Sequence, residues 1–222
     1  MDASFSQEIF DLLLRSRHTL LDILDERGYE TKAYRNISPE QIAILGSGEA
    51  RALDIVVPRK KEDTTAPCDR AVVVYLLNIS IRKSVEKAFL RDTIGDEVAD
   101  EVVPNQADDI TFILNEPYNE VFDKVSLQWW QTKKIRVRFF HIKQVVVHLG
   151  RHVLVPPHRK LTADEIKVEM EKMYITQKSQ FPLIKHSDIQ ARILGLVPGD
   201  LVEIQRPSPT AGFLRFLRIC AA

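Results

Sequence analysis

Cysteine is scarce in this sequence of 222 residues: only Cys68 and Cys220 are present, and they lie far apart. A disulfide framework or a cysteine zinc site requires several cysteines at short spacings. The sequence therefore predicts neither of them, and a reducing compartment is favoured.

Long apolar runs are also missing. The longest ones, such as residues 71–77, fall well short of the roughly 20 apolar residues that a membrane-spanning helix needs. The N-terminal sequence MDASFSQEIF has no basic region followed by an apolar stretch, so no signal peptide is expected. Together these absences predict a soluble intracellular chain with no membrane partner.

An excess of charge of either sign is absent as well. Lysine and arginine together number 31, and aspartate and glutamate also number 31, so the overall charge does not predict a nucleic-acid-binding protein. The balance is uneven along the chain, however. Residues 150–222 hold 11 basic and 7 acidic side chains, so the preceding residues have an excess of acidic ones. This weak asymmetry suits assembly into a charged complex.

Motifs of the common enzyme classes are missing too. There is no glycine-rich phosphate-binding loop and no G-x-S-x-G nucleophile motif. His152 and His158 could suggest a metal site, but the prolines between them favour an extended backbone that separates the two imidazoles by about 18 Å. No metal or cofactor is therefore expected. A metal-dependent nuclease using Asp54 and Glu30-Thr31-Lys32 is an alternative, although nothing in the sequence shows that these carboxylates converge.

Helices and strands alternate through the first two thirds of the chain. Strand patterns occupy residues 52–57, 71–78, 110–114, 135–142 and 145–149, and helical patterns occupy residues 5–27, 80–94 and 119–130, with a short helix opened by Pro39. This alternation predicts an α/β domain with a mixed sheet. Paired prolines in residues 150–158 mark a natural boundary, so we expect one domain at 1–149 and a small α+β module at 150–222.

The last forty residues, 181–220, begin with a short helix. Ser187 and Gln190 have the spacing of a capping box, so residues 188–194 are predicted to be helical. Gly195 lies where a left-handed residue would end this helix.

A turn and two strands follow. Pro198-Gly199 has the residues that a type II turn requires, and Val202 and Ile204 alternate with polar residues, which predicts a strand with one buried face. After a loop at 206–212 that prolines restrict, residues 213–220 are predicted to form a second strand that is mostly apolar on both faces. The core of a small module can cover only one of these faces, so we expect a partner to cover the other. The alternative is an ordinary central strand that is enclosed in a larger domain.

Several short motifs in this part of the chain carry a family resemblance. They are His152-Val-Leu-Val-Pro156-Pro-His158, Leu161-Thr162 with Glu165, Gly195-Leu-Val-Pro-Gly199, and Arg206-Pro-Ser208-Pro-Thr210-Ala-Gly212. In this order they resemble the C-terminal module of the fifth subunit shared by eukaryotic nuclear RNA polymerases, a family that includes its archaeal homologue. The resemblance covers residues 149–220. The family usually has Asp-Pro where Asp188-Ile189 stands, and polar or tyrosine residues at 213, 214 and 217, so the chain looks like a divergent member.

The resemblance implies a non-catalytic structural subunit of a multi-subunit DNA-dependent RNA polymerase in the nucleus, with no cofactor. Residues 150–222 would dock on the largest subunit and assemble with other polymerase subunits, and residues 1–149 would form part of the jaw near downstream duplex DNA. The candidate partner-binding residues are Pro156, His158, Arg206, Ser208, Thr210, Gly212, Phe213, Phe216 and Arg218. A free-standing protein-interaction adaptor is the alternative function.

A basic cluster follows two tryptophans, Trp129 and Trp130. It consists of Lys133, Lys134, Arg136 and Arg138. Cations beside aromatic rings can contact phosphates and bases, so these residues are the candidates for non-specific contact with downstream DNA. The alternative is that the tryptophans pack in the core and the charges form a solvated face.

Overall fold

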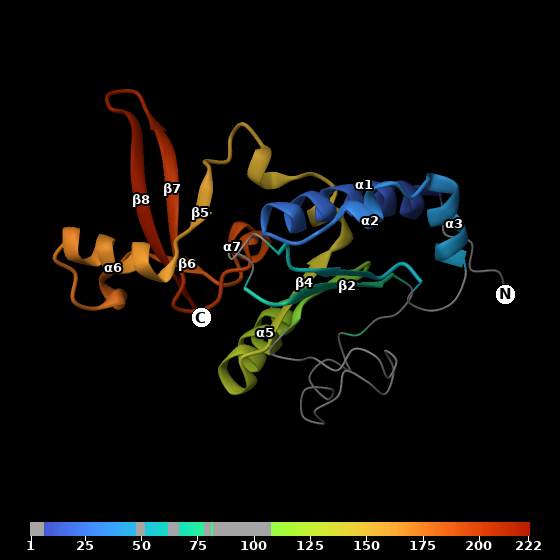
Figure 1. Ribbon diagram of the computed structural model, residues 1–222, viewed down its shortest axis with the longest axis horizontal. Coiled ribbons are helices and arrows are strands. Elements are labelled where there is room, and N and C mark those ends of the chain that lie inside the picture. The colour runs from blue at the N-terminus through green and yellow to red at the C-terminus, as the bar shows by residue number, and fades with distance from the viewer. Residues whose placement is uncertain (1–6, 48–51, 62–66, 78–80, 82–107) are drawn as a thin grey trace. The chain divides into compact units, whose positions relative to one another are not determined.

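The computed structural model describes residues 7–47, 52–61, 67–77, 81 and 108–222 (Figure 1). The chain divides into two compact units, Met1–Val147 and His148–Ala222. Among the described residues, no helix is both long enough and apolar enough to cross a membrane.

The N-terminal unit begins with three helices, α1 (Gln7–Glu26), α2 (Lys32–Arg35) and α3 (Pro39–Ser47). One face of α1 is buried through Leu13, Leu20 and Leu24 at helical spacing, and Gly28 follows its end with φ of 88°. Helix α3 starts as predicted, because the side chains of Ser38 and Gln41 each accept a hydrogen bond from the other residue's backbone N–H.

The sheet of this unit has the order β1-β2-β3-β4, with β1 (Ile55–Pro58), β2 (Arg70–Leu76), β3 (Asp108–Leu114) and β4 (Arg136–His141). β1 is antiparallel to β2, whereas β2, β3 and β4 run parallel. The predicted mixed sheet is therefore confirmed. Parallel strands are buried on both faces, which accounts for the continuous burial of β3.

Helices cover the two faces of this sheet. Helix α5 (Glu120–Lys133) starts at Asn119, whose side chain accepts from the Val121 N–H, and it buries Phe122 and Trp129 against one face. The Phe112 and Phe139 rings stack there with centroids 5.2 Å apart. Figure 1 shows α1 on the opposite side of the sheet from α5. The unit is thus an α/β sandwich.

Two predictions for this unit need comment. The predicted strand at 145–149 is wrong, because residues Ile142–Val145 and Leu149–Arg151 form 3-10 turns. His141 causes the first turn, since its imidazole Nδ1 accepts from the Lys143 backbone N–H while the backbone N–H of His141 donates to the Gln144 side chain. A local cap therefore overrides the strand preference of the valines that follow. The predicted helix at 80–94 lies almost wholly outside the described residues.

The C-terminal unit is α+β, as predicted. Its elements are β5 (His158–Lys160), α6 (Ala163–Lys172), the 3-10 turn η3 (Lys178–Gln180), β6 (Leu183–Lys185), α7 (Ile189–Leu194), β7 (Leu201–Ser208) and β8 (Gly212–Ala221). The sheet has the order β5-β7-β8-β6. β7 pairs antiparallel with both β5 and β8, and β6 runs parallel to β8.

Both faces of this sheet are covered at the base of the β7–β8 hairpin. Leu217 and Ile219 pack on one face with Ile166 of α6. Cys220 and Val202 pack on the other face with residues of α7. The prediction that the unit covers only one face of the second strand is therefore wrong here, because a helix lies against each face.

The turns before the hairpin are mostly as predicted. Gly195 ends α7 with φ of 70°, and Gly199, at φ of 95°, lies in a turn closed by the bond from Asp200 N–H to Val197 O at 3.0 Å. The helix cap differs: Asp188, not Ser187, accepts from the first N–H groups of α7. A carboxylate accepts these bonds more strongly than a hydroxyl, so the cap forms one residue later.

Candidate protein-docking site

The β7–β8 hairpin extends beyond the body of the C-terminal unit. The loop predicted at 206–212 is shorter in the structure, where it consists of residues 209–211, because strand pairing continues through Arg206↔Leu214 and Pro207↔Phe213 to Ser208↔Gly212. Proline lacks an N–H group. Pro207 is tolerated in β7 because β5 pairs with β7 only at residues 202–204, so no described strand lies along that edge of β7 at Pro207. Gly212 then takes the left-handed φ of 71° that closes the turn.

The outer half of this hairpin exposes large apolar side chains. Phe213 is 73% exposed, Leu214 46% and Phe216 41%. Because side chains alternate along a strand, Phe213 lies on one face and the other two lie on the opposite face. An apolar cluster of this kind is typical of a surface that another protein covers.

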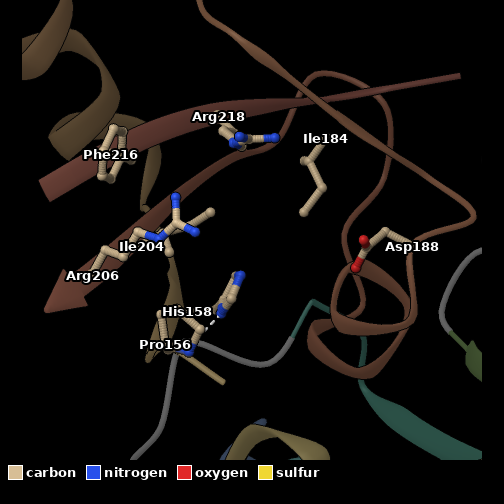
Figure 2. Close-up of a pocket in the computed structure, with 8 residues that line it drawn as sticks. All are labelled: Pro156, His158, Ile184, Asp188, Ile204, Arg206, Phe216 and Arg218. Atoms are coloured by element: carbon tan, nitrogen blue, oxygen red, sulfur yellow. Dashed lines mark hydrogen bonds between the residues drawn. The ribbon is translucent and has the colours of Figure 1, made fainter. Parts of the chain in front are cut away.

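A pocket of about 250 Å³ lies at the foot of this exposed region (Figure 2). Five of the predicted partner-binding residues line it: Pro156, His158, Arg206, Phe216 and Arg218. The other four, Ser208, Thr210, Gly212 and Phe213, lie at the tip of the hairpin. The structure thus divides the predicted set between a pocket and a tip.

Three further residues line the pocket that sequence reasoning did not select, Ile184, Asp188 and Ile204. Ile204 lies in the pocket because it pairs with His158 across β5 and β7. Ile184 lies there because it pairs with Cys220 across β6 and β8. Because these pairings join residues that are far apart in the sequence, the only sequence signal that Ile184 and Ile204 line a pocket was their apolar character.

Two of the polar side chains that line the pocket, Arg206 and Arg218, are cationic. The imidazole Nδ1 of His158 donates to the Pro156 carbonyl, since a carbonyl oxygen can only accept. Arg218 Nη1 donates to Leu183 O at 3.2 Å. The single carboxylate, Asp188, already accepts from Gln190 N at 2.8 Å and Ala191 N at 3.4 Å. The two guanidinium groups therefore face the pocket without an ion-pair partner among the described residues.

The opposite face of the hairpin carries an ion-pair network. Glu203 is buried and accepts from Arg159 and Arg215, at 2.7 and 2.6 Å, and Arg215 also donates to Glu169 at 2.7 Å. The hydrogen bond from Arg215 lowers the pKa of Glu203 despite its burial. The alternation in β7 predicted that only the face of Val202 and Ile204 is buried. This prediction is wrong at Glu203, because the ion-pair network buries its side chain on the other face. The network joins β5, β7, β8 and α6.

The basic cluster beside α5 is split by the structure. Arg138 is 2% exposed and pairs with Asp109, so it cannot reach a phosphate, and its selection as a DNA-proximal residue is wrong. Lys134 and Arg136 lie over the Trp130 ring, at 5.2 and 4.8 Å from its centroid. Trp129 is buried in the core. A base that stacked on the Trp130 ring would therefore compete with these two cations.

The residues of the nuclease alternative have structural partners. Asp54 accepts a hydrogen bond from the Tyr75 backbone N–H at 3.1 Å, and the Thr31 hydroxyl accepts from Arg35 at 3.1 Å. Within the described part of the chain, no group of three or more His, Cys, Asp or Glu side chains converges as metal ligands do.

Comparison with known proteins connects this structure to a family. Residues 147–220 match the family described as RNA polymerase Rpb5, C-terminal domain. The chain is 31% identical to DNA-directed RNA polymerases I, II, and III subunit rpabc1 of Dictyostelium discoideum, over 96% of this chain and 99% of that protein. It is 49% identical to DNA-directed RNA polymerase subunit Rpo5 of Pyrococcus abyssi, over 32% of this chain and 87% of that protein.

The chain is therefore a non-catalytic subunit of a DNA-directed RNA polymerase and functions in transcription together with other polymerase subunits. It belongs to the Rpb5 family. The archaeal relative aligns with only about a third of the chain, whereas the Dictyostelium relative extends across nearly all of it.

Proposed function

We propose that the C-terminal unit docks this subunit on the largest subunit of the polymerase, and that the N-terminal unit forms part of the jaw near downstream duplex DNA. The single observation that supports docking is the exposed apolar half of the hairpin beside a cationic pocket. The domain assignment is accordingly a jaw-like domain at 1–149 and an assembly module at 150–222. The family resemblance supports the jaw assignment.

Two further points belong to this proposal. Relatives named as subunits of RNA polymerases I, II and III come from Dictyostelium and Caenorhabditis, both eukaryotes, which supports a nuclear location for this chain. The family resemblance, in which positions 213 and 214 are usually polar or tyrosine, supports a divergent member, because Phe213 and Leu214 are exposed and apolar in this chain.

Docking through the C-terminal unit is tested by co-expression with the largest subunit. We expect the full chain to co-purify with that subunit, and a chain truncated after residue 147 to be absent from the complex although its own core is intact. The truncation removes the hairpin and the pocket together. Retention of the truncated chain at the level of the full chain would mean that the N-terminal unit carries the docking surface.

Contact of the N-terminal unit with DNA has a salt-dependent signature. In the assembled polymerase, Lys134→Ala together with Arg136→Ala should lower the slope of log affinity against log salt on downstream duplex by about 0.9 for each phosphate that is no longer neutralised. Sequence preference should not change, because phosphate contacts carry no base information.

The control for this measurement is Lys124→Ala, which removes an exposed lysine from α5, the helix that precedes Lys134 and Arg136. It should leave the salt slope unchanged. A slope that is the same in the double variant, the control and the unmodified enzyme would show that the Trp130 cluster is a solvated surface rather than a DNA contact.

A further inference from the structure

The pocket of the C-terminal unit combines unpaired cations with an apolar floor. We propose that it receives the carboxylate of an aspartate or glutamate from an extended segment of the polymerase subunit on which this chain docks. An apolar side chain of the same segment packs on Phe216 and Ile204. This inference rests on the proposed docking function and adds the chemistry of the segment that is recognised.

The cations of the pocket are placed on one face by strand pairing. Arg206 pairs with Leu214 and Arg218 with Val202, so both arginines project on the same face of the β7–β8 hairpin. His158 pairs with Ile204 and therefore lies on this face too. Figure 2 shows the Arg206 guanidinium and the His158 imidazole pointing toward the middle of the pocket, with Arg218 along the opposite wall.

The guanidinium groups have hydrogen-bonding capacity left over. The Arg206 guanidinium makes no hydrogen bond or ion pair with the described residues. The Arg218 guanidinium uses one N–H, which donates to Leu183 O at 3.2 Å. Each guanidinium has five N–H donors in a planar fork that matches the two oxygens of a carboxylate. The arginines on the other face of the sheet, Arg159 and Arg215, are already paired with Glu203. Unlike Arg159 and Arg215, the two arginines of the pocket thus have no carboxylate partner among the described residues.

The apolar lining favours a carboxylate of a polypeptide over a phosphate of nucleic acid as the group that binds in the pocket. Ile184, Ile204 and Phe216 contribute hydrocarbon to the pocket, and Phe216 is 41% exposed. The sugar-phosphate backbone of a nucleic acid is mainly polar and charged, so it covers these side chains poorly. Asp188 adds a negative charge to the wall, which opposes the run of adjacent phosphodiester anions of a nucleic acid more strongly than it opposes one isolated carboxylate. An acidic residue flanked by an apolar residue satisfies both parts of the pocket.

Charge reversal in the full chain tests this inference. Arg206→Glu and Arg218→Glu should each weaken binding to the co-expressed largest subunit at least about tenfold, because each places a like charge against the incoming carboxylate. The control is Lys185→Glu, an exposed residue of β6 on the opposite face of the same sheet. It makes the same change in net charge and should have little effect.

Photo-crosslinking identifies the segment. A benzophenone amino acid at position 216 of the assembled complex should attach to a peptide that contains Asp or Glu within a few residues of the crosslink. Changing that acidic residue to Lys should restore binding of the Arg218→Glu variant.

Each outcome distinguishes the inference from the docking proposal. If the chain binds the largest subunit and both arginine variants behave like Lys185→Glu, docking stands and the carboxylate inference is overturned. A crosslink to a segment without acidic residues, or to DNA, also overturns it. A crosslink to an acidic segment of another polymerase subunit, with charge-swap rescue, supports the carboxylate inference and refutes docking on the largest subunit.

Discussion

Replacing Asp109 with asparagine is expected to lower the free energy of unfolding of the N-terminal unit by about 3–5 kcal/mol, the usual cost of removing one partner from a buried ion pair. The Asp109 carboxylate accepts from the guanidinium groups of Arg27 and Arg138, and from the Tyr29 hydroxyl at 3.2 Å. Asp109 and Arg138 are 1% and 2% exposed. Without the carboxylate, two buried cations lose their counter-charge.

The same group makes stability depend on pH. Burial by itself raises the pKa of Asp109, but the charges of Arg138 and Arg27 outweigh burial and hold that pKa at about 2, below the ordinary 3.8. A lowered carboxylate pKa contributes stability that is fully present above the unfolded value and is lost as the pH falls through the folded one. The difference in stability between the unmodified chain and Asp109→Asn should therefore shrink between about pH 4 and pH 2.

Chemical denaturation at several pH values measures both effects. The control is Asp69→Asn, which removes a carboxylate that lies 3.5 Å from Arg59 with 74% of its side chain exposed. An exposed pair of this kind contributes at most about 1 kcal/mol. Equal losses of stability in the two variants would contradict the assignment of Asp109 as the central acceptor of a buried cluster.

Two adjacent residues of β8 should separate stability from assembly. Leu217 is 6% exposed and packs with Leu201 and Ile219, so Leu217→Ala should lower the free energy of unfolding by about 2–5 kcal/mol. Phe216 is 41% exposed beside the pocket, so Phe216→Ala should cost little stability. If the pocket is part of the docking surface, Phe216→Ala should weaken assembly by about 2 kcal/mol or more, as aromatic anchors do.

The two variants are compared by melting of the free chain and by retention in the polymerase at a temperature where both are folded. We expect Leu217→Ala to melt lower and to assemble once folded, and Phe216→Ala to melt normally and to assemble poorly. Normal assembly of Phe216→Ala would remove the hairpin from the docking surface and leave its exposed apolar residues without a partner.

Local sequence signals were sufficient for most of the elements. Helical periodicity located α1, Asn119 located the start of α5, and glycines at 195 and 199 marked backbone with positive φ. Each of these signals acts between residues within about one turn of one another, so no knowledge of the rest of the chain is required. Local signals failed where two of them competed. After His141 the valines predicted a strand, but the hydrogen bonds of the His141 cap formed a 3-10 turn instead.

The candidate site was only partly predictable. Sequence reasoning located Phe216 and Arg218 on a strand whose two faces were both mostly apolar, and it selected Arg206 from a motif of the family resemblance. It missed Ile184 and Ile204, which reach the pocket only through pairing with β8 and β5. Register between strands depends on contacts between distant residues, and an alternating pattern by itself does not define which residues become opposite neighbours.

By itself, the sequence determined the class of each unit, most helix and strand positions and the polymerase family, because these follow from local periodicity and short linked motifs. Only the tertiary structure decided which charged side chains are available to bind a partner. Arg138 belongs to the same basic run as Arg136, yet it lies beside Asp109 in the core. Arg215 and Arg218 are three residues apart on β8, yet only the former is held by glutamates. The reason is physical: a charge is available for binding only where folding leaves it without a counter-charge, and that depends on which distant residues are brought against it.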